Sequence, residues 1–390
     1  MSSPSTSSAD NLLTLTYKYI GQVPVLLDVY LPETKIVSQD LQTAHIPAVI
    51  YFHGGGLTVG NRKSWFPHWL KGGYAVLSYL LILILYMSDR VIDAGFLFIC
   101  PDYRLIPPSS GHDLLEDIKD LFHFVVHGMN VALSTRKGAP RLQLNPDAIA
   151  VAGSSAGGLC AYLAAMHAHP TPKAVVSLYG MGGDFLTPHY LSEKRKVFFR
   201  GRELLEPEAF SQFIYPASLN LGAIIDSPLS YHPSTSPTPG YPANPRMQLA
   251  RLYLQMGNFL DYYTGQHEPS LSANLQEVLI SDNRAQSSGN DKPEDLLSLI
   301  PKSHRDLFPQ FAIFDSWPPT LLVHGSEDSA VQVHESIHLH RLLQSAGVAS
   351  TLRVVDSEEH SFDYAPDAHT KFGMKGGLFD DILDFLLKYL

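Results

Sequence analysis

Short apolar runs alternate with longer amphipathic stretches along most of this chain. Such an alternation is typical of parallel strands that are joined by crossover helices. The apolar runs predict strands over residues 13–20, 24–32, 48–52, 96–100, 148–153, 174–179, 320–324 and 351–355, the first two antiparallel. The amphipathic stretches predict helices over about 112–127, from about 157, over about 330–345 and over about 377–389. We therefore predict an α/β fold with a mostly parallel sheet.

Residues 185–310 interrupt the alternation. They are rich in Pro and Tyr, and their clearest helical pattern covers residues 246–263. Small and polar residues dominate 281–295, which predicts a mobile loop. Because the interruption separates two predicted strands, we interpret 185–310 as an inserted lid or cap, and residues 17–184 together with 311–390 as the core.

The most apolar segment, residues 71–88, does not fit this pattern. Its central run is about as apolar as a membrane helix, but a helix needs roughly 20 residues to cross a bilayer. Without the segment, SWFPHWL would join DRVIDAGFLFICPDYRL as one helix followed by its strand. Three hypotheses stay open for this anomalous insertion: a retained intron of 18 codons, a hydrophobic element that packs on the lid or on a membrane surface, and an ordinary buried strand.

A serine flanked by small residues follows one of the buried strands. The run Gly153-Ser154-Ser155-Ala156-Gly157 fits G-x-S-x-G, with an apolar strand before it and an Ala-rich helix after it. A sharp turn from strand to helix requires small flanking residues, and the start of the helix offers N–H groups to a developing oxyanion. The spacing predicts Ser155 as a nucleophile and Ser154 as a turn residue.

The run His53-Gly54-Gly55-Gly56 directly follows another buried strand, AVIYF. Adjacent glycines let the backbone approach a substrate closely, and their N–H groups can point at an oxyanion. We expect a Cβ at Gly55 to crowd the place of the substrate carbonyl.

The remaining catalytic candidates follow the last two predicted strands. Asp328 lies after strand 320–324, and His360 lies after strand 351–355. This gives the chain order nucleophile, acid, base. His360 would take the proton from Ser155, and Asp328 would hold the imidazole in the required tautomer. The neighbouring alternatives are Glu327 for the acid and His324, His334, His338 and His340 for the base. None of these histidines follows the last strand.

The pieces YFHGGG, PDYRL, GSSAGG, HGSEDSAV and EEHSF occur in this order over residues 51–362. In them the chain resembles the hormone-sensitive-lipase-like branch of the α/β-hydrolases, the group called α/β-hydrolase fold 3. The resemblance implies a mostly parallel eight-stranded sheet flanked by helices, with an inserted lid. It also implies a carboxylesterase or lipase that acts on small-molecule esters through an acyl-enzyme without a cofactor. By resemblance, the oxyanion donors would be the N–H groups of Gly55, Gly56 and Ala156.

Two features depart from the family's pattern. The family usually has Asp where Ser154 stands, which leaves the triad intact and is expected to shift the pH behaviour. Residues 1–16 are shorter than the family's N-terminal cap segment, so the lid and the substrate preference do not carry over. We interpret Asp102 and Arg104 of PDYRL as structural residues.

Other functions would use different residues or different substrates. The run HESIH at residues 334–338 fits the zinc signature H-E-x-x-H, with Glu358 or Glu359 as a conceivable third ligand. Its helix is expected on the outside of the sheet and the two glutamates beside His360, so we predict no metal. An amidase, a lactonase or a deacetylase could use the same residues. A non-catalytic binding protein of this fold usually lacks a triad member, and here all three are present.

The composition narrows the partners and the compartment. There are 28 Lys and Arg residues against 38 Asp and Glu, and this net charge of −10 argues against nucleic acid and anionic membranes as partners. Cys100 and Cys160 lie in apolar runs, which predicts buried free thiols in a reducing compartment. The Ser-rich start lacks the basic and apolar regions of a secretory signal. We therefore expect a disordered tail over residues 1–16 and a cytoplasmic protein. The many Tyr, Phe and Pro residues of the lid predict an apolar pocket for short or medium acyl esters.

Overall fold

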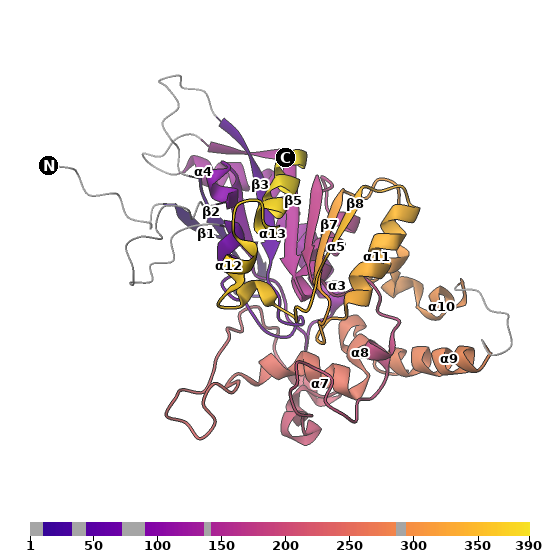
Figure 1. Ribbon diagram of the computed structural model, residues 1–390. Helices are drawn as coiled ribbons and strands as arrows, with labels where there is room; N and C mark the ends of the chain where they lie inside the picture. The colour runs from indigo at the N-terminus through magenta and orange to yellow at the C-terminus, as the bar shows by residue number, and fades with distance from the viewer. Residues whose placement is uncertain (1–10, 33–43, 72–89, 136–141, 286–293) are drawn as a thin grey trace.

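Eight strands form one sheet in the computed structural model, which describes residues 11–32, 44–71, 90–135, 142–285 and 294–390 (Figure 1). In chain order they are β1 (Leu12–Ile20), β2 (Val23–Tyr30), β3 (Ala44–Phe52), β4 (Leu97–Pro101), β5 (Leu142–Ser154), β6 (Ala174–Leu178), β7 (Thr320–Gly325) and β8 (Ser350–Val355). Their order in the sheet is β1-β2-β4-β3-β5-β6-β7-β8. β2 is antiparallel to both β1 and β4, and the pairs from β4 to β8 are parallel. The predicted fold class and the antiparallel opening pair are confirmed.

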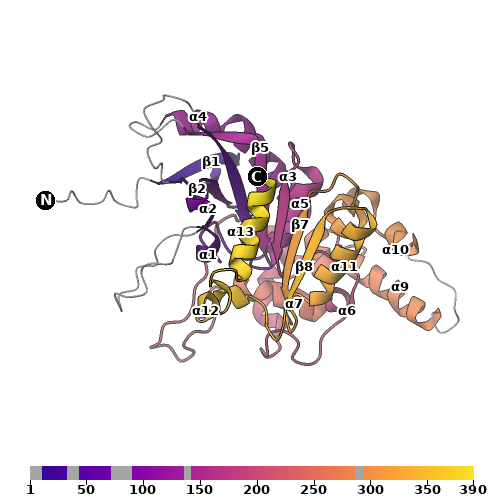
Figure 2. The ribbon, with the colours of Figure 1, turned by 45° about the horizontal axis from the view of Figure 1, so that its top comes forward.

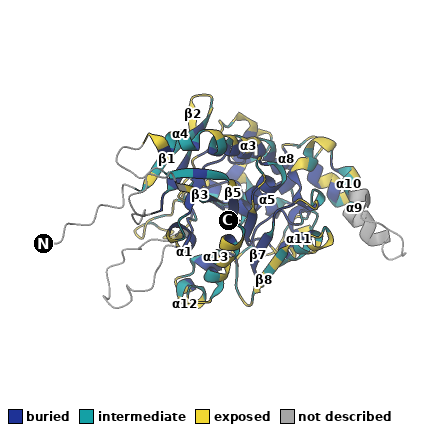
Figure 3. Cartoon of the chain, turned by 90° about the horizontal axis from the view of Figure 1, so that it is seen from above, coloured by how far each residue is buried: buried dark blue, intermediate teal, exposed yellow. Residues whose placement is uncertain are grey.

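Helices cover both faces of the sheet (Figure 2). One face carries α3 (Gly111–His127), α4 (Met129–Ser134), α5 (Ala156–His167) and α11 (Val333–Ser345), and the other carries α1 (His68–Lys71), α2 (Arg90–Asp93) and α13 (Leu378–Tyr389). A short helix, α12 (Ala368–Phe372), precedes α13. The central strands β4 and β6 are buried along their whole length because side chains of both faces meet a helix layer. In Figure 3 the buried residues, in dark blue, gather in the middle of the molecule, and the exposed ones, in yellow, lie mostly at its periphery.

Two strands are longer than predicted. β5 begins at Leu142 and β3 at Ala44, and their first residues pair with each other. Each extension contains a proline, Pro47 or Pro146, and the register between the two strands shifts next to Pro47. Proline cannot donate a ladder hydrogen bond, so the local pattern there does not resemble a strand. The pairing of the two extensions was therefore missed.

The interrupted region contains several short helices. They are α6 (Pro188–Leu191), α7 (Leu249–Met256), α8 (Phe259–Thr264), α9 (Leu271–Ala285) and α10 (Glu294–Leu299), with 3-10 turns between them. The prediction of one helix over 246–263 is wrong, because Gly257 adopts a left-handed conformation (φ 69°) that ends α7 before α8 begins. The prediction of a loop over 281–295 is also wrong at both ends, because α9 extends to Ala285 and α10 begins at Glu294. Its centre, 286–293, lies outside the described residues.

α1 and α2 flank the anomalous insertion. Residues 72–88 of that insertion lie outside the described part of the chain. A hydrogen bond joins the two sides of the insertion, because Nη1 of Arg90, after it, donates to the carbonyl of Trp69, before it, at 3.2 Å. β4 pairs with β2 on one edge and with β3 on the other. The prediction of a strand over 96–100, directly before PDYRL, is therefore confirmed.

The prediction of a disordered tail over residues 1–16 is wrong at its end. β1 already begins at Leu12, because this alternating segment pairs with β2. Residues 1–10 lie outside the described part. Among the described helices, none has both the length and the hydrophobicity that crossing a bilayer requires.

Candidate active site

Ser155 occupies the turn between β5 and α5. Its backbone is strained, with φ 54° and ψ −121°. The turn also requires its two flanking glycines. A Cβ on Gly153 would lie 2.1 Å from the carbonyl oxygen of Gly157, and one on Gly157 would lie 2.0 Å from that of Phe52. The sequence therefore forms the sharp turn that G-x-S-x-G predicts.

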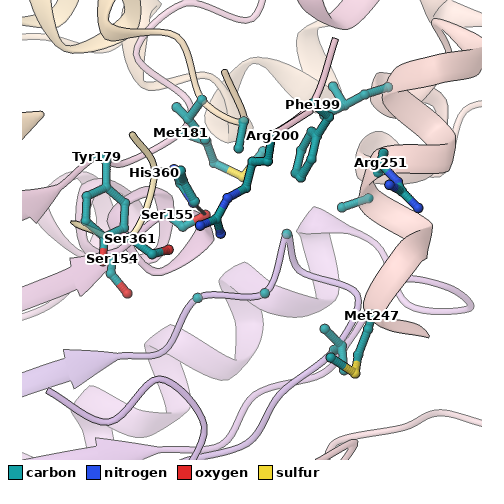
Figure 4. A pocket seen from close by; sticks show the side chains of 18 of the residues that line it. Ser154, Ser155, Tyr179, Met181, Phe199, Arg200, Met247, Arg251, His360 and Ser361 are labelled. Carbon is teal, nitrogen blue, oxygen red and sulfur yellow. Dashed lines mark hydrogen bonds between the residues drawn. The ribbon is translucent and has the colours of Figure 1, made fainter. Parts of the chain in front are cut away.

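The structure brings the three predicted catalytic residues together. Oγ of Ser155 lies 3.0 Å from Nε2 of His360, and Nδ1 of His360 lies 2.6 Å from Oδ2 of Asp328 (Figure 4). All three follow carboxyl ends of parallel strands, which meet at one edge of the sheet. The three side chains are thus within hydrogen-bonding distance of one another, the arrangement that a nucleophile, a base and a group orienting the base require.

The loop after β7 fixes the carboxylate of Asp328. Its Oδ1 accepts hydrogen bonds from the N–H groups of Ala330 at 2.9 Å and Val331 at 2.8 Å. Burial alone would raise the pKa of this carboxyl, but the charge of His360 and hydrogen bonds from His324 and His360 outweigh burial and hold the pKa below its usual range. The side chain is therefore ionised throughout the neutral range.

The rival residues have other contacts. Glu327 is exposed, whereas Asp328 is buried. His324 is buried beneath the acid, with Nε2 3.3 Å from Oδ2 of Asp328 and Nδ1 2.7 Å from Oγ of Ser336. Sequence reasoning treated His324 only as a competitor for the role of base. Its position four residues before the acid was the available signal that it supports the carboxylate.

The glycine loop after β3 lines the same pocket as Ser155. Gly55 and Gly56 have φ of 105° and 60°, which favours glycine. None of the N–H groups of Gly55, Gly56 and Ala156 donates to another residue of the described chain. The expectation for a Cβ at Gly55 is wrong. It would meet the carbonyl oxygen of Val59 at 2.1 Å, so the glycine is required by packing within the loop.

His53 and Gly54 support this loop from below. The imidazole of His53 is buried and stacks on the ring of Tyr103 at 4.2 Å, and its Nδ1 lies 2.7 Å from the carbonyl of Gly54. Burial lowers the pKa of His53 to about 4, so the ring is neutral at pH 7. A Cβ on Gly54 would lie 3.2 Å from the carbonyl of Ser154. The loop thus packs closely on the turn that carries Ser155.

The HESIH run lies on α11, and none of its residues lines the pocket at Ser155. Glu335 is buried, and its carboxyl oxygens accept hydrogen bonds from the N–H groups of Gly182 and Gly183 and the hydroxyl of Tyr190. His338 contacts the carbonyl of Gly183 at 2.8 Å. Nε2 of His334 lies 3.0 Å from Asp184. No group of three or more His, Cys, Asp or Glu side chains suited to a metal occurs within the described residues. The glutamate of the run therefore anchors the chain after β6.

Glu358 and Glu359, the conceivable third ligands, lie in the His360 loop. Oε1 of Glu359 accepts hydrogen bonds from the N–H groups of Ser329 at 2.7 Å and His360 at 2.9 Å. Glu358 pairs with Lys371 at 3.1 Å. Glu359 thus joins the loop that carries the acid to the loop that carries the base.

A polar network lies behind the nucleophile turn. Tyr51 donates a hydrogen bond of 2.8 Å to the buried Oγ of Ser154. Asp363 accepts hydrogen bonds from Tyr179 and Trp69, and burial raises its pKa to about 6. The edge of the Tyr179 ring packs on the imidazole of His360, with centroids 4.7 Å apart. Sequence reasoning missed this network, although the Ser at position 154 was a signal that the surroundings of the turn differ.

A pocket lies above Ser155 (Figure 4). Its apolar wall includes Met181 and, from the interrupted region, Phe199, Met247, Ala250, Leu254 and Phe259. Three arginines, Arg200, Arg202 and Arg251, also line it. The lining is therefore less apolar than the sequence predicts.

PDYRL places its charged residues in buried ion pairs outside this pocket. Asp102 pairs with Nη1 of Arg62 at 2.7 Å, and Nε of Arg104 donates to Asp117 at 2.9 Å. Neither residue lines the pocket. Cys100 and Cys160 are buried free thiols, as their apolar surroundings predict.

Two family models match the chain. The one described as alpha/beta hydrolase fold matches residues 49–243, which is half of the chain. The one described as prolyl oligopeptidase family matches residues 284–390. The first match runs from β3 into the interrupted region and includes the glycine loop and Ser155, and the second includes Asp328 and His360.

Proteins similar to this chain include polyketide synthases and esterases. The chain is 27% identical to the "Non-reducing polyketide synthase ausA" of Aspergillus calidoustus, over 91% of its own length and 13% of that protein. It is 23% identical to the "Probable carboxylesterase M8" of a Phoma strain, over 89% of this chain and 88% of that protein. An esterase from Pyrobaculum calidifontis has a similar fold, with a TM-score of 0.51, 17% identity, and coverage of 97% of this chain and 86% of that chain.

Proposed function

We propose that this chain, which belongs to the alpha/beta hydrolase fold family, is a serine hydrolase that cleaves carboxylic esters. The observation that carries the proposal is the hydrogen-bonded series from Ser155 through His360 to Asp328 at the pocket. The esterase among the similar folds and the relative named as a probable carboxylesterase support the same reaction class. The proposed reaction uses neither a metal nor an organic cofactor.

The first step transfers the acyl group to the enzyme. Oγ of Ser155 attacks the ester carbonyl while Nε2 of His360 accepts its proton. The bond from the carbonyl carbon to the alcohol oxygen then breaks, and the alcohol leaves with the proton from His360. Asp328, held by two backbone N–H groups, stabilises the imidazolium across the 2.6 Å contact with Nδ1.

The second step releases the acid. A water molecule attacks the acyl-enzyme, His360 takes its proton and returns it to Oγ of Ser155, and the carboxylic acid leaves. In both steps, the N–H groups of Gly55, Gly56 and Ala156 would donate to the oxygen that becomes negative. Donors that are already in place cost no reorganisation when the charge develops.

The pocket supports a small-molecule substrate. The apolar side chains of its wall, among them Met181, Phe199 and Leu254, suit a short or medium acyl group or an aromatic group of similar size. We propose that residues 185–310 act as the lid, because α7 and the turn at Phe199–Arg202 contribute to that wall. An amidase, a lactonase or a deacetylase would use the same three catalytic residues on a different leaving group.

The match to polyketide synthases favours a second candidate. In that case the acyl group reaches Ser155 as a thioester, and a thiol leaves in place of an alcohol. The chain spans 13% of the length of those synthases, so their overall activity does not carry over as such. The chemistry at Ser155 and His360 would otherwise be the same.

A panel of matched substrates tests the proposal. An oxygen ester, a thioester, an anilide and a lactone with acyl groups of equal length are compared by kcat/KM, with the Ser155→Ala variant as background. We expect the highest kcat/KM for the oxygen ester. A higher value for the thioester would favour the second candidate. No turnover above the variant's background with any substrate would overturn the proposal.

A further inference from the structure

The charged lining of the pocket has one sign. Three arginines, Arg200, Arg202 and Arg251, belong to the described lining, and no Lys, Asp or Glu does. This is unexpected in a chain with a net charge of −10. We propose that the substrate is an ester that also carries a carboxylate, and that Arg251 and Arg202 bind this carboxylate while Ser155 attacks the ester carbonyl. This inference rests on the proposed esterase function.

Arg200 is not free for this role. Its Nε lies 3.4 Å from Oε2 of Glu359, and its backbone N–H donates to Oγ of Ser329 at 2.7 Å. Its φ of 51° places it in a tight turn that the hydrogen bond from the N–H of Arg202 to the carbonyl of Phe199 closes. The turn fastens the lid to the catalytic loops, and Glu359 already balances the charge of Arg200.

Arg251 has no such counter-charge. It lies on α7, across the pocket from Ser155 and His360 (Figure 4), and only 7% of its surface is exposed. Its Nη2 donates to Oε1 of Gln248 at 3.0 Å, and the hydroxyl of Tyr241 donates to the same oxygen at 2.8 Å. Within the described residues, no carboxylate lies within 4 Å of its guanidinium. A buried charge is costly unless an opposite charge or hydrogen bonds compensate it.

Arg202 brings a second positive charge to the same end of the pocket. Its side chain is exposed, and it lines both this pocket and the neighbouring cavity together with Arg251. Burial, and then the charge of Arg202, lower the pKa of Arg251. Two adjacent guanidinium groups repel each other, and a carboxylate between them would replace the repulsion by charge-assisted hydrogen bonds. Guanidinium groups suit carboxylates because their N–H groups match the two oxygens.

The test uses two isosteric esters, 4-(acetoxymethyl)benzoate and 4-(acetoxymethyl)benzamide. They share the ester bond and the leaving alcohol's shape, and they differ in one negative charge that is not conjugated with the reacting group. We expect the wild-type kcat/KM for the benzoate to exceed that for the benzamide by about 10- to 100-fold, the range of one charge-assisted hydrogen bond. Arg251→Gln and Arg202→Gln should each lower this ratio by about tenfold or more.

Arg195→Gln is the matched control, because this arginine lies in the same region but its side chain is 84% exposed and does not line the pocket. It should leave the ratio unchanged. If Arg251→Gln folds poorly, the ratio can still be measured for Arg202→Gln, because the side chain of Arg202 is exposed. A wild-type ratio near one, or a ratio that neither pocket variant lowers, would overturn the inference.

Binding to the Ser155→Ala variant separates this inference from the proposed function. Calorimetry measures the dissociation constants of the two esters in the absence of turnover, so their difference reports on binding of the carboxylate. Tighter binding of the benzoate together with no hydrolysis by the wild type would support the anion site and overturn the esterase proposal. Hydrolysis of both esters at equal kcat/KM, with equal binding, would overturn the anion site and leave the esterase proposal standing.

Discussion

Replacing Asp328 by Asn changes the hydrogen-bonded series with almost no change in shape. Oδ1 of this side chain accepts hydrogen bonds from the N–H groups of Ala330 and Val331. In the variant, these donors will select the amide oxygen for the same place. The amide nitrogen must then face Nδ1 of His360, where the carboxylate oxygen lay at 2.6 Å.

The new amide donates a hydrogen bond to Nδ1, so the proton of a neutral imidazole moves to Nε2. That nitrogen lies 3.0 Å from Oγ of Ser155 and can no longer accept the serine proton. The wrong tautomer lowers kcat by about 10⁴ in a triad of this kind. This corresponds to a rise of about 5 kcal/mol in the activation free energy.

The assay compares kcat for Asp328→Asn and Glu327→Gln on the best ester of the panel, at one pH near 7.5. The second variant removes the charge of the exposed neighbour and should retain full activity. Near-UV circular dichroism checks that both variants are folded. A loss below about tenfold in Asp328→Asn, or an equal loss in Glu327→Gln, would refute the assignment of Asp328 as the residue that orients His360.

Further outcomes follow from the same contacts. Ser155→Ala should lower kcat by about 10⁶, whereas Ser154→Ala should keep most of the activity because it removes the acceptor of Tyr51 and leaves the candidate triad in place; reversed results would contradict the choice between the two serines. Gly55→Ala should lower kcat by roughly 10²–10³, since the new Cβ meets the carbonyl of Val59 and moves the donor loop; unchanged turnover of the folded variant would remove the loop from the mechanism. Burial raises the pKa of Glu335 to about 8, so the folded state binds more protons than the unfolded state and the free energy of unfolding falls as the pH rises from about 5 to 8. Urea unfolding should show that the free energy of unfolding of Glu335→Gln falls between pH 5 and pH 8 by at least about 1.4 kcal/mol less than that of the wild type. An equal change in the two proteins would be inconsistent with the raised pKa. Deletion of residues 71–88 should raise the soluble yield and keep the esterase activity, because the deletion removes the uncharged run LLILIL; an insoluble or inactive product would show that the segment belongs to the fold.

Much of the sheet was predictable because buried strands leave continuous apolar runs. The missed parts have physical reasons. The paired extensions of β3 and β5 contain Pro47 and Pro146, which hide a strand pattern. The apolar pattern over 246–263 continues through Gly257 because α7 and α8, on either side of it, are both buried. The break between the two helices comes from the left-handed conformation of Gly257, which the pattern does not reveal.

The candidate triad was predictable because each member follows the carboxyl end of a strand, and the topology of the sheet brings those ends together. The supporting contacts were not. Tyr51 and Ser154 are more than 100 residues apart, and so are Asp363 and Tyr179, and no local motif connects such pairs. The charge of the pocket was also hidden, since Arg251 is the one charged residue of α7, and its lack of a carboxylate partner among the described residues can be seen only in three dimensions.

The most direct test of the central claim is the site of covalent capture by a fluorophosphonate. The folded wild-type protein is treated with the reagent, and the adduct is located by intact mass and peptide mapping. We expect one adduct on Oγ of Ser155, absent in Ser155→Ala and formed far more slowly in Asp328→Asn. An adduct on another residue, or a wild-type protein that stays unlabelled while it hydrolyses esters, would contradict the account.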